Sequence, residues 1–179
     1  INSNTLARFG KIWVRNLIAN LHLIAESTGI NRLSSQFSDI PVIVVAAGPS
    51  LDKILPVLAE VRKRFLIIAV DTAMEGCISA GITPDFLVVV DPQYWNTRHL
   101  DNCSTMETIL ISESSTHPRV FRILEKTSLY FCSSLFPLGQ YVENKTETKG
   151  VLGAGGSVST SAWDFARNLG CSPIIMAGL

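Results

Sequence analysis

The sequence has no excess of charge of either sign and no long apolar run. Its 179 residues carry 15 basic and 15 acidic side chains. Proteins that bind nucleic acid through its phosphates usually show a basic excess or a basic stripe, and we find neither. The longest apolar runs, such as residues 86–90, have the length of a strand and are too short to cross a bilayer. The sequence therefore predicts neither a nucleic-acid partner nor a membrane span.

Cysteine is scarce as well, and the four cysteines form neither a C-x-x-C pair nor a Cys/His pair at zinc spacing. Hydrophobic residues make up 47% of the chain, which is enough to bury a core without disulfides. We therefore expect reduced thiols and a cytoplasmic location. No secretory leader precedes the first helical pattern, but residue 1 is Ile1, so we expect the chain to be a fragment whose true start lies elsewhere.

An apolar stripe predicts a helix over residues 4–27. Its members recur every three or four positions: Leu6, Phe9, Trp13, Leu17, Leu21 and Ile24. Residues 31–39 are polar and rich in serine, which suggests a linker. The helix either packs on the following domain or belongs to a neighbouring region, and we favour the second. This divides the chain into residues 1–38, a helix with a linker, and residues 39–179, a nucleotide-binding domain.

Apolar strand patterns alternate with helical patterns over the second part. We predict strands at 41–47, 65–70, 86–90, 108–111, 129–131 and 174–176, and helices at 51–63, 72–80, 121–125 and 157–169. Continuous Val, Ile and Leu runs between helices are typical of a parallel sheet covered on both faces. The predicted fold class is α/β, an open, doubly wound, mostly parallel Rossmann-like sheet, plus the N-terminal helix. Residues 133–152 lack a period and predict a polar lid or binding loop.

The first candidate site follows the first predicted strand, at Gly48, Pro49 and Ser50. In open parallel sheets, ligands bind beyond the C-terminal ends of the strands. A glycine allows close approach to a ligand, and the helix N-terminus that follows attracts phosphate. An ordinary strand-to-helix turn explains the same residues equally well. The segment matches neither the P-loop nor the G-x-G-x-x-G pattern, which argues against a Walker-type kinase or ATPase.

The second candidate is a glycine-rich segment with Gly153, Gly155, Gly156 and Ser157 at the start of the last predicted helix. Backbone N–H groups there are suited to cradle a phosphate. The alternative is close packing of helix and strand through small residues.

Two aspartates end successive predicted strands, as Asp71-Thr72 and Asp91-Pro92. A carboxylate at such a position accepts ribose hydroxyls, binds a base amino group or holds Mg²⁺. The alternative for each is a helix cap, because Asp is a common N-cap residue. Two aspartates at neighbouring strand ends favour a shared site.

These segments together resemble the motility accessory factor (Maf) and MptE-like family. Ala46-Ala47-Gly48-Pro49-Ser50-Leu51-Asp52 is similar to the opening motif of the family. Later blocks follow in the same order, at residues 69–71, 81–85, 91–92, 155–158 and 169–179. The resemblance covers residues 39–179.

The resemblance implies two activities. Flagellar members are similar to glycosyltransferases that move a sialic-acid-like sugar from a CMP-activated donor to flagellin Ser or Thr, and this activity is our first hypothesis. Archaeal members resemble a 6-hydroxymethylpterin diphosphokinase that uses ATP. For the first activity, the nucleotide would be held by Gly48, Pro49, Ser50, Asp71, Thr72, Asp91 and Pro92, and its phosphate by Gly155, Gly156 and Ser157. For the second activity, Asp71 and Asp91 would hold Mg²⁺.

The first and last blocks are also similar to those of bacterial sialyltransferases, with departures. This chain has Ala47, Asp71 and Asp91 where those enzymes carry asparagine, which argues against the same CMP contacts and leaves room for a metal. The resemblance puts the catalytic groups beyond Leu179, so no general base is assigned. A third hypothesis is a nucleotide-sensing or interaction module without chemistry, because a fold does not by itself establish a reaction.

Overall fold

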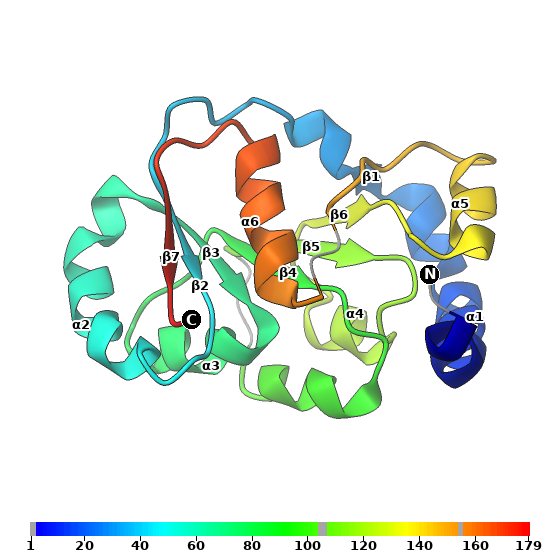
Figure 1. Ribbon diagram of the computed structural model, residues 1–179, viewed down its shortest axis with the longest axis horizontal. Coiled ribbons are helices and arrows are strands. Elements are labelled where there is room, and N and C mark those ends of the chain that lie inside the picture. Colours follow the sequence, from blue (N-terminus) through cyan, green and yellow to red (C-terminus); the bar gives the residue numbers. More distant parts are fainter. Residues whose placement is uncertain (1–2, 104–106, 154–155) are drawn as a thin grey trace.

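The computed structural model contains one seven-stranded sheet with helices on both sides (Figure 1). It describes residues 3–103, 107–153 and 156–179. The strands are β1 (Thr28–Gly29), β2 (Val42–Val45), β3 (Leu66–Val70), β4 (Phe86–Val89), β5 (Ile109–Glu113), β6 (Leu129–Cys132) and β7 (Ile174–Ala177). The α-helices are α1 (Ser3–Glu26), α2 (Leu51–Val61), α3 (Asp71–Ser79), α4 (Arg119–Ile123), α5 (Pro137–Glu143) and α6 (Val158–Asn168). Three 3₁₀ helices are η1 (Ile30–Leu33), η2 (Arg62–Arg64) and η3 (Tyr94–Leu100).

The strand order is β1-β6-β5-β4-β3-β2-β7, and every neighbouring pair is parallel. All residues of β2 and β4 are buried, which explains why their sequences are continuous runs of Val, Leu, Ile and Phe. The predicted Rossmann-like α/β class is confirmed.

The direction of the connections determines the layers. From β2 to β6, each strand lies next to its predecessor in the same direction along the sheet. Because crossovers between parallel strands are right-handed, α2, α3 and α4 fall on one face. The chain then returns from β6 to β7 over the opposite face, where α6 contacts β2, β3 and β4 and crosses in front of the sheet in Figure 1. The order reverses at β2, between β3 and β7.

Helix α1 packs on the rest of the chain and lies on the β6 side of the sheet, beside α5 (Figure 1). The sequence left two possibilities for this helix, and the structure shows the first. Its buried face carries Leu17 and Ile24. Two members of the predicted stripe were wrong, because Leu6 and Leu21 are more than 40% exposed. The buried face of α1 therefore follows a different line along the helix from the predicted stripe, and it includes positions that are not apolar.

The two segments predicted without regular structure contain short elements. The segment after α1 forms β1 and η1 and then runs along the end of α6, where Ser35 N donates to Asn168 O and Phe37 N donates to Leu169 O. The loop predicted over residues 133–152 contains α5, so the absence of a helix there was wrong. A helix of seven residues is too short to show a period of 3.6 clearly. The division of the chain at residue 38 stays a prediction.

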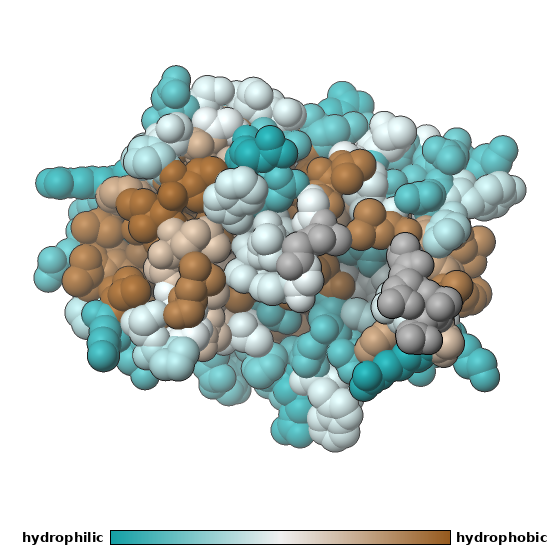
Figure 2. Space-filling view, viewed as in Figure 1, coloured by the Kyte–Doolittle hydropathy of each residue, from teal (hydrophilic) through white to brown (hydrophobic). Residues whose placement is uncertain are grey.

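Apolar surface remains exposed at one end of the molecule, over α2 and β7 (Figure 2). Val57, Ile175 and Leu179 are between 43% and 69% exposed. All four cysteines are buried and free, in agreement with the predicted reduced thiols. None of the helices in the described ranges is long and apolar enough to span a membrane.

Candidate functional site

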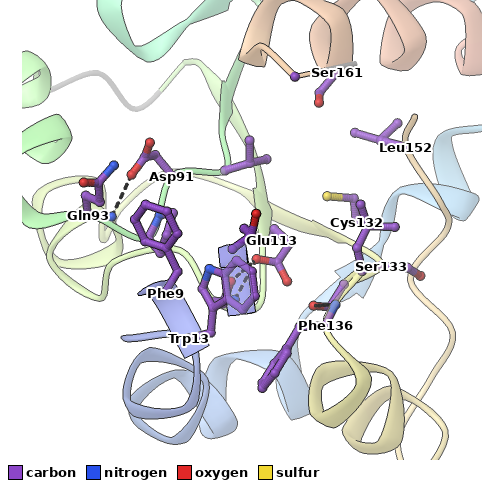
Figure 3. Close-up of a pocket in the computed structure, with 17 residues that line it drawn as sticks. Phe9, Trp13, Asp91, Gln93, Glu113, Cys132, Ser133, Phe136, Leu152 and Ser161 are labelled. Carbon is purple, nitrogen blue, oxygen red and sulfur yellow. Dashed lines mark hydrogen bonds between the residues drawn. The ribbon is translucent and has the colours of Figure 1, made fainter. Parts of the chain in front are cut away.

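A cavity of about 700 Å³ lies beyond the C-terminal ends of β4, β5 and β6 (Figure 3). Its other walls come from α1, from the residues just before α5 and from the beginning of α6. This is the C-terminal edge of the sheet, at which open parallel sheets bind their ligands. The cavity lies beside β4, β5 and β6 and not at β2, where the strand order reverses. Its size and its place at this edge make it the candidate functional site.

Glu113, the last residue of β5, points into this cavity (Figure 3). It pairs in register with Cys132, the last residue of β6, which also lines the cavity. Register partners in parallel strands point to the same face, so the sheet itself brings these two side chains together. Val90, directly after β4, continues the lining on the next strand.

The carboxylate of Glu113 is oriented by the turn that follows β5. Its Oε1 accepts a hydrogen bond from Ser114 Oγ at 2.9 Å, and its Oε2 accepts one from Ser115 N at 3.0 Å and another from the Ser115 hydroxyl. No ion pair with Glu113 occurs among the described residues. Glu113 thus contributes a well-oriented negative charge that no cationic side chain balances.

Asp91 brings a second carboxylate to the same cavity. It is half-buried, and its Oδ1 accepts a hydrogen bond from Gln93 N at 2.7 Å, which closes a tight turn after β4. Pro92 lines the cavity beside it. In the described part of the chain no ion pair engages Asp91. The structure therefore brings two of the predicted site residues, Asp91 and Pro92, to the cavity.

Three aromatic rings form a continuous wall on the side of α1. Phe9 stacks on Trp13 with ring centroids 6.2 Å apart, and Trp13 contacts Phe136 at 5.4 Å. Phe136 immediately precedes α5, so the wall joins two elements that are far apart in the sequence. In Figure 3, Trp13 overlaps Glu113 in projection and Phe136 lies below both; all three residues line the cavity.

Asn16 fastens α1 to the rim of the cavity. It is fully buried, and its Nδ2 donates to Pro92 O and to Ser115 O, both at 2.9 Å. Both acceptor residues line the cavity. One turn further along α1, Asn20 makes the same type of contact, with Ser114 O and Thr116 O. The position of the aromatic wall relative to Glu113 therefore depends on two buried asparagines.

The beginning of α6 reaches the cavity through Gly156 and Ser161. Ser157 is the N-cap of α6, and its Oγ accepts a hydrogen bond from Ser159 N at 3.1 Å. Gly153 N donates to Asp164 Oδ2 at 2.7 Å, which ties the preceding loop to the helix. Gly155 lies outside the described residues. Of the described residues of the predicted phosphate site, Gly156 lines the same cavity as Asp91, whereas Gly153 and Ser157 do not.

Gly48, Pro49 and Ser50 are not among the residues that line this cavity. They follow β2 at the point where the strand order reverses, next to the residues after β7. A Cβ atom on Gly48 would lie 2.5 Å from Gly178 O, so the glycine is needed for close packing of the two turns. Ser50 Oγ donates to Leu179 O at 3.3 Å and makes no capping bond to α2. A ligand-binding role for these residues stays a prediction.

Asp71 is buried in the first turn of α3, with only 3% of its surface exposed. Its Oδ1 accepts a hydrogen bond from Thr72 N at 2.9 Å. Burial raises the pKa of Asp71 above its ordinary value, the negative charge of Asp91 raises it further, and the Thr72 bond and His99 lower it. Asp71 and Thr72 do not line the cavity. Asp71 is electrostatically coupled to Asp91, while its predicted contact with a nucleotide or metal stays a prediction.

A further acidic residue, Glu143 of α5, contacts the backbone of Ser134, which lines the cavity. Its Oε1 accepts a hydrogen bond from Ser134 N at 2.7 Å, and burial raises the pKa of Glu143. Burial, followed by the charges of Glu113 and Glu143, also raises the pKa of the Cys132 thiol. A protonated thiol is a poor nucleophile, and we assign Cys132 to the lining of the cavity.

The family model described as 6-hydroxymethylpterin diphosphokinase MptE-like matches residues 15–179. The chain belongs to this family. The match begins inside α1, at Arg15, and so includes the two asparagines that fasten the helix to the cavity. The predicted family resemblance is confirmed, and it extends further toward the N-terminus than the motifs that suggested it.

Several uncharacterized proteins of Treponema pallidum (strain Nichols) are similar to this chain. One is 34% identical over 119 residues, which are 56% of this chain and 29% of the relative. Another is 37% identical over 86 residues, 48% of this chain and 40% of the relative. A third is 24% identical over 174 residues, 96% of this chain and 36% of the relative. The chain thus spans between 29% and 40% of the length of these relatives.

The fold is shared with a solved structure, the MAf glycosyltransferase from Magnetospirillum magneticum AMB-1. The TM-score is 0.64 at 23% sequence identity, over 88% of this chain and 27% of that chain. At this level of identity the likeness concerns the fold alone.

Sequence reasoning missed several residues of the cavity, above all Glu113. The predicted strand ended at residue 111, two residues too early, and hid an acidic residue at a strand end. The criterion that selected Asp71 and Asp91 would have selected Glu113 with the correct boundary. Trp13 and Phe136 carried no signal of this kind, because an aromatic residue in a helical stripe or a loop usually serves packing.

Proposed function

We propose that this chain is the nucleotide-binding part of a transferase, with the nucleotide phosphates between the beginning of α6 and Asp91. The observation that supports it is that Gly156 and Asp91 line one cavity at the C-terminal ends of parallel strands. Backbone N–H groups at the start of α6, a helix of 11 residues, attract a phosphate group. The remainder of the cavity, toward the aromatic wall, is then available for the group that accepts the transfer.

The charge of the cavity favours a nucleotide that carries a divalent cation. Asp91 and Glu113 line it, whereas no Lys, Arg or His of the described residues does. Mg²⁺ is usually held by one or two carboxylates together with substrate phosphates. The described residues contain no group of three or more His, Cys, Asp or Glu that could hold a metal by itself, which agrees with a cation that arrives with the nucleotide. Asp91 is the residue that would hold it.

The first candidate is therefore a Mg²⁺-dependent diphosphokinase that uses ATP. The description of the family, 6-hydroxymethylpterin diphosphokinase, supports it. The chain's own contribution would be to hold the phosphates at the start of α6 and to orient the acceptor against the aromatic wall. Stabilisation of the departing phosphate by backbone N–H groups that are already in position would lower the barrier to transfer.

The second candidate is glycosyl transfer from a CMP-activated, sialic-acid-like donor to flagellin. The likeness of the fold to a MAf glycosyltransferase favours it. Such a donor and ATP are both anionic, so either nucleotide needs a cation beside the two carboxylates of the cavity. ATP is usually bound together with Mg²⁺, which Asp91 would hold, and for this reason the diphosphokinase is the better fit to the cavity.

Thermal-shift titration with CMP, CDP, ATP and GTP, each with and without Mg²⁺, tests the proposal. A ligand that binds only the folded state raises the melting temperature. We expect the largest rise with ATP and Mg²⁺, and a smaller rise in Asp91→Asn and Ser157→Ala. Glu60→Gln, which removes an exposed carboxylate on α2, is the matched control and should behave like the parent chain.

The outcomes separate the hypotheses. A rise with CMP or CDP that needs no metal would support glycosyl transfer. Binding of ATP without turnover in the full-length protein would support a nucleotide-sensing module. No rise with any nucleotide in the full-length protein would contradict the proposed nucleotide site.

A further inference from the structure

The part of the cavity farthest from α6 combines negative charge with aromatic rings. Glu113 is half-buried, and a carboxylate that is partly withdrawn from water strongly favours a positive partner. No Lys, Arg or His of the described residues lines the cavity. The Arg8 guanidinium lies 5.2 Å from the centre of the Phe9 ring, but Arg8 is not one of the lining residues. The cavity therefore has room for a cation that the chain does not itself supply.

The aromatic wall indicates which kind of cation fits. The faces of Trp and Phe rings attract cations, and the attraction grows when water is excluded. Trp13 and Phe136 meet at 51° with centroids 5.4 Å apart, so they form an angled surface instead of a flat stack. Figure 3 shows both rings on the side of the cavity where Glu113 projects. A group that lies between the two rings and Glu113 would contact aromatic carbon on one side and the carboxylate on the other.

We propose that this surface, formed by Trp13, Phe136 and Glu113, binds the protonated amine of an organic molecule. A metal ion is the alternative cation, but it needs several oxygen ligands and gains little from aromatic rings. The described residues offer no group of three or more metal-ligating side chains. An alkylammonium group, by contrast, uses the rings through cation–π attraction and Glu113 through a charge-assisted hydrogen bond.

The inference rests on the proposed function in one respect, since the amine would belong to the acceptor of the transferase. The nucleotide occupies the end of the cavity at Gly156 and Asp91, and the amine occupies the end at Trp13 and Glu113. The acceptor would thus be selected for positive charge, which an anionic or uncharged molecule of the same shape lacks.

Three probes of nearly equal shape test the charge preference: cyclohexylamine, cyclohexanol and cyclohexanecarboxylate. Each is titrated into the purified protein without nucleotide, and binding is followed by tryptophan fluorescence and by calorimetry. We expect cyclohexylamine to bind about tenfold more tightly than cyclohexanol, as cation–π and charge-assisted contacts predict, and the carboxylate to bind most weakly. The fluorescence change should disappear in Trp13→Phe, since Trp95 and Trp163 lie outside the lining.

Two variants assign the preference to the named residues. Glu113→Gln should reduce the preference for the amine to about twofold while the affinity for cyclohexanol stays the same. Phe136→Leu, which leaves the turn after β5 intact, should weaken the amine several-fold more than the alcohol. Glu60→Gln should change neither. Circular dichroism and the melting temperature confirm that each variant is folded.

Three results of the titrations with these probes and variants would overturn the inference. They are equal binding of amine and alcohol, an unchanged preference in both Glu113→Gln and Phe136→Leu, and no binding of any probe. Competition in which Mg²⁺ alone displaces cyclohexylamine at equal concentration would assign the surface to a metal ion and would also overturn it. Because these titrations contain no nucleotide, their failure is distinct from a failure of the nucleotide titrations.

Discussion

Replacing Asn20 by alanine should destabilise the folded chain by removing the contact between α1 and the turn after β5. The Nδ2 of Asn20 donates to Ser114 O at 3.0 Å and to Thr116 O at 2.9 Å, and Asn20 is 1% exposed. In the variant, both carbonyl oxygens lose their donor in a buried place. Each such loss costs about 1–3 kcal/mol. Alanine has no amide group to bury, so the variant also avoids the cost of withdrawing that group from water. We therefore expect the free energy of unfolding to fall by about 2–3 kcal/mol, at the lower end of the sum for the two oxygens.

Asn16 provides a matched comparison on the same helix. It donates to two carbonyl oxygens in the same way, but its own Oδ1 is buried and has no hydrogen-bond partner among the described residues. Asn16→Ala removes this unsatisfied acceptor together with the two donated bonds. The relief offsets about 1 kcal/mol, so Asn16→Ala should cost about 1–2 kcal/mol.

Urea denaturation followed by circular dichroism measures both costs as changes in the free energy of unfolding. Leu21→Ala, at a position on α1 that is 41% exposed, is the control and should stay within about 0.5 kcal/mol of the parent chain. A cost for Asn20→Ala within that same margin would refute the anchoring role of the asparagines. A cost for Asn16→Ala equal to or above that of Asn20→Ala would refute the argument from the unsatisfied oxygen.

Two further predictions concern Asp71 and a glycine. The pKa of Asp71 is raised in the folded state above its ordinary value of 3.8, because the side chain is buried. The folded chain therefore binds the Asp71 proton more strongly than the unfolded chain does. The stability that this proton contributes is present below pH 3.8 and is lost as pH rises through the folded-state pKa. Asp71→Asn should therefore raise the melting temperature at pH 7, with a gain that shrinks toward pH 4; a gain independent of pH in a melting series would contradict this. Gly81 and Gly178 both have positive φ, but only at Gly178 would a Cβ collide with a backbone atom, Ala46 O. Gly81→Ala should lower the free energy of unfolding by about 1–2 kcal/mol, because alanine is strained in the left-handed backbone conformation. Gly178→Ala should lower it by about 1–3 kcal/mol more, because of the added collision. Equal losses in urea denaturation would show that the turn at Gly178 relaxes freely.

Local patterns in the sequence predicted the strands well. Strands β3 and β4, for example, are runs of apolar residues, almost all buried, that the chain carries within five positions. The class of the fold follows from the alternation of such runs with helices. Short elements such as β1 and α5 escaped prediction, because their ordering depends on neighbours such as β6 and α1 and not on their own sequence.

The candidate site was predictable only in part. Asp91 ends an apolar strand, and this local signal was sufficient to select it. Asn16 lies on a helix, and its partners Pro92 and Ser115 are 76 and 99 positions away, so nothing near it in the sequence reveals its role. Glu113 was missed because the predicted strand ended two residues too early. This boundary error changes the fold little, but it removes a carboxylate from the predicted site.

The sequence by itself determined the α/β class and the family, and it predicted the edge of the sheet at which a ligand would bind, because these depend on periodicity and on motifs carried within short segments. The tertiary structure decided which strand ends share a cavity. The order β6-β5-β4 brings Cys132, Glu113 and Asp91 together, whereas Gly48 lies beside β7 and packs against Gly178. Strand order and register join residues that are distant along the chain, so no local pattern contains them.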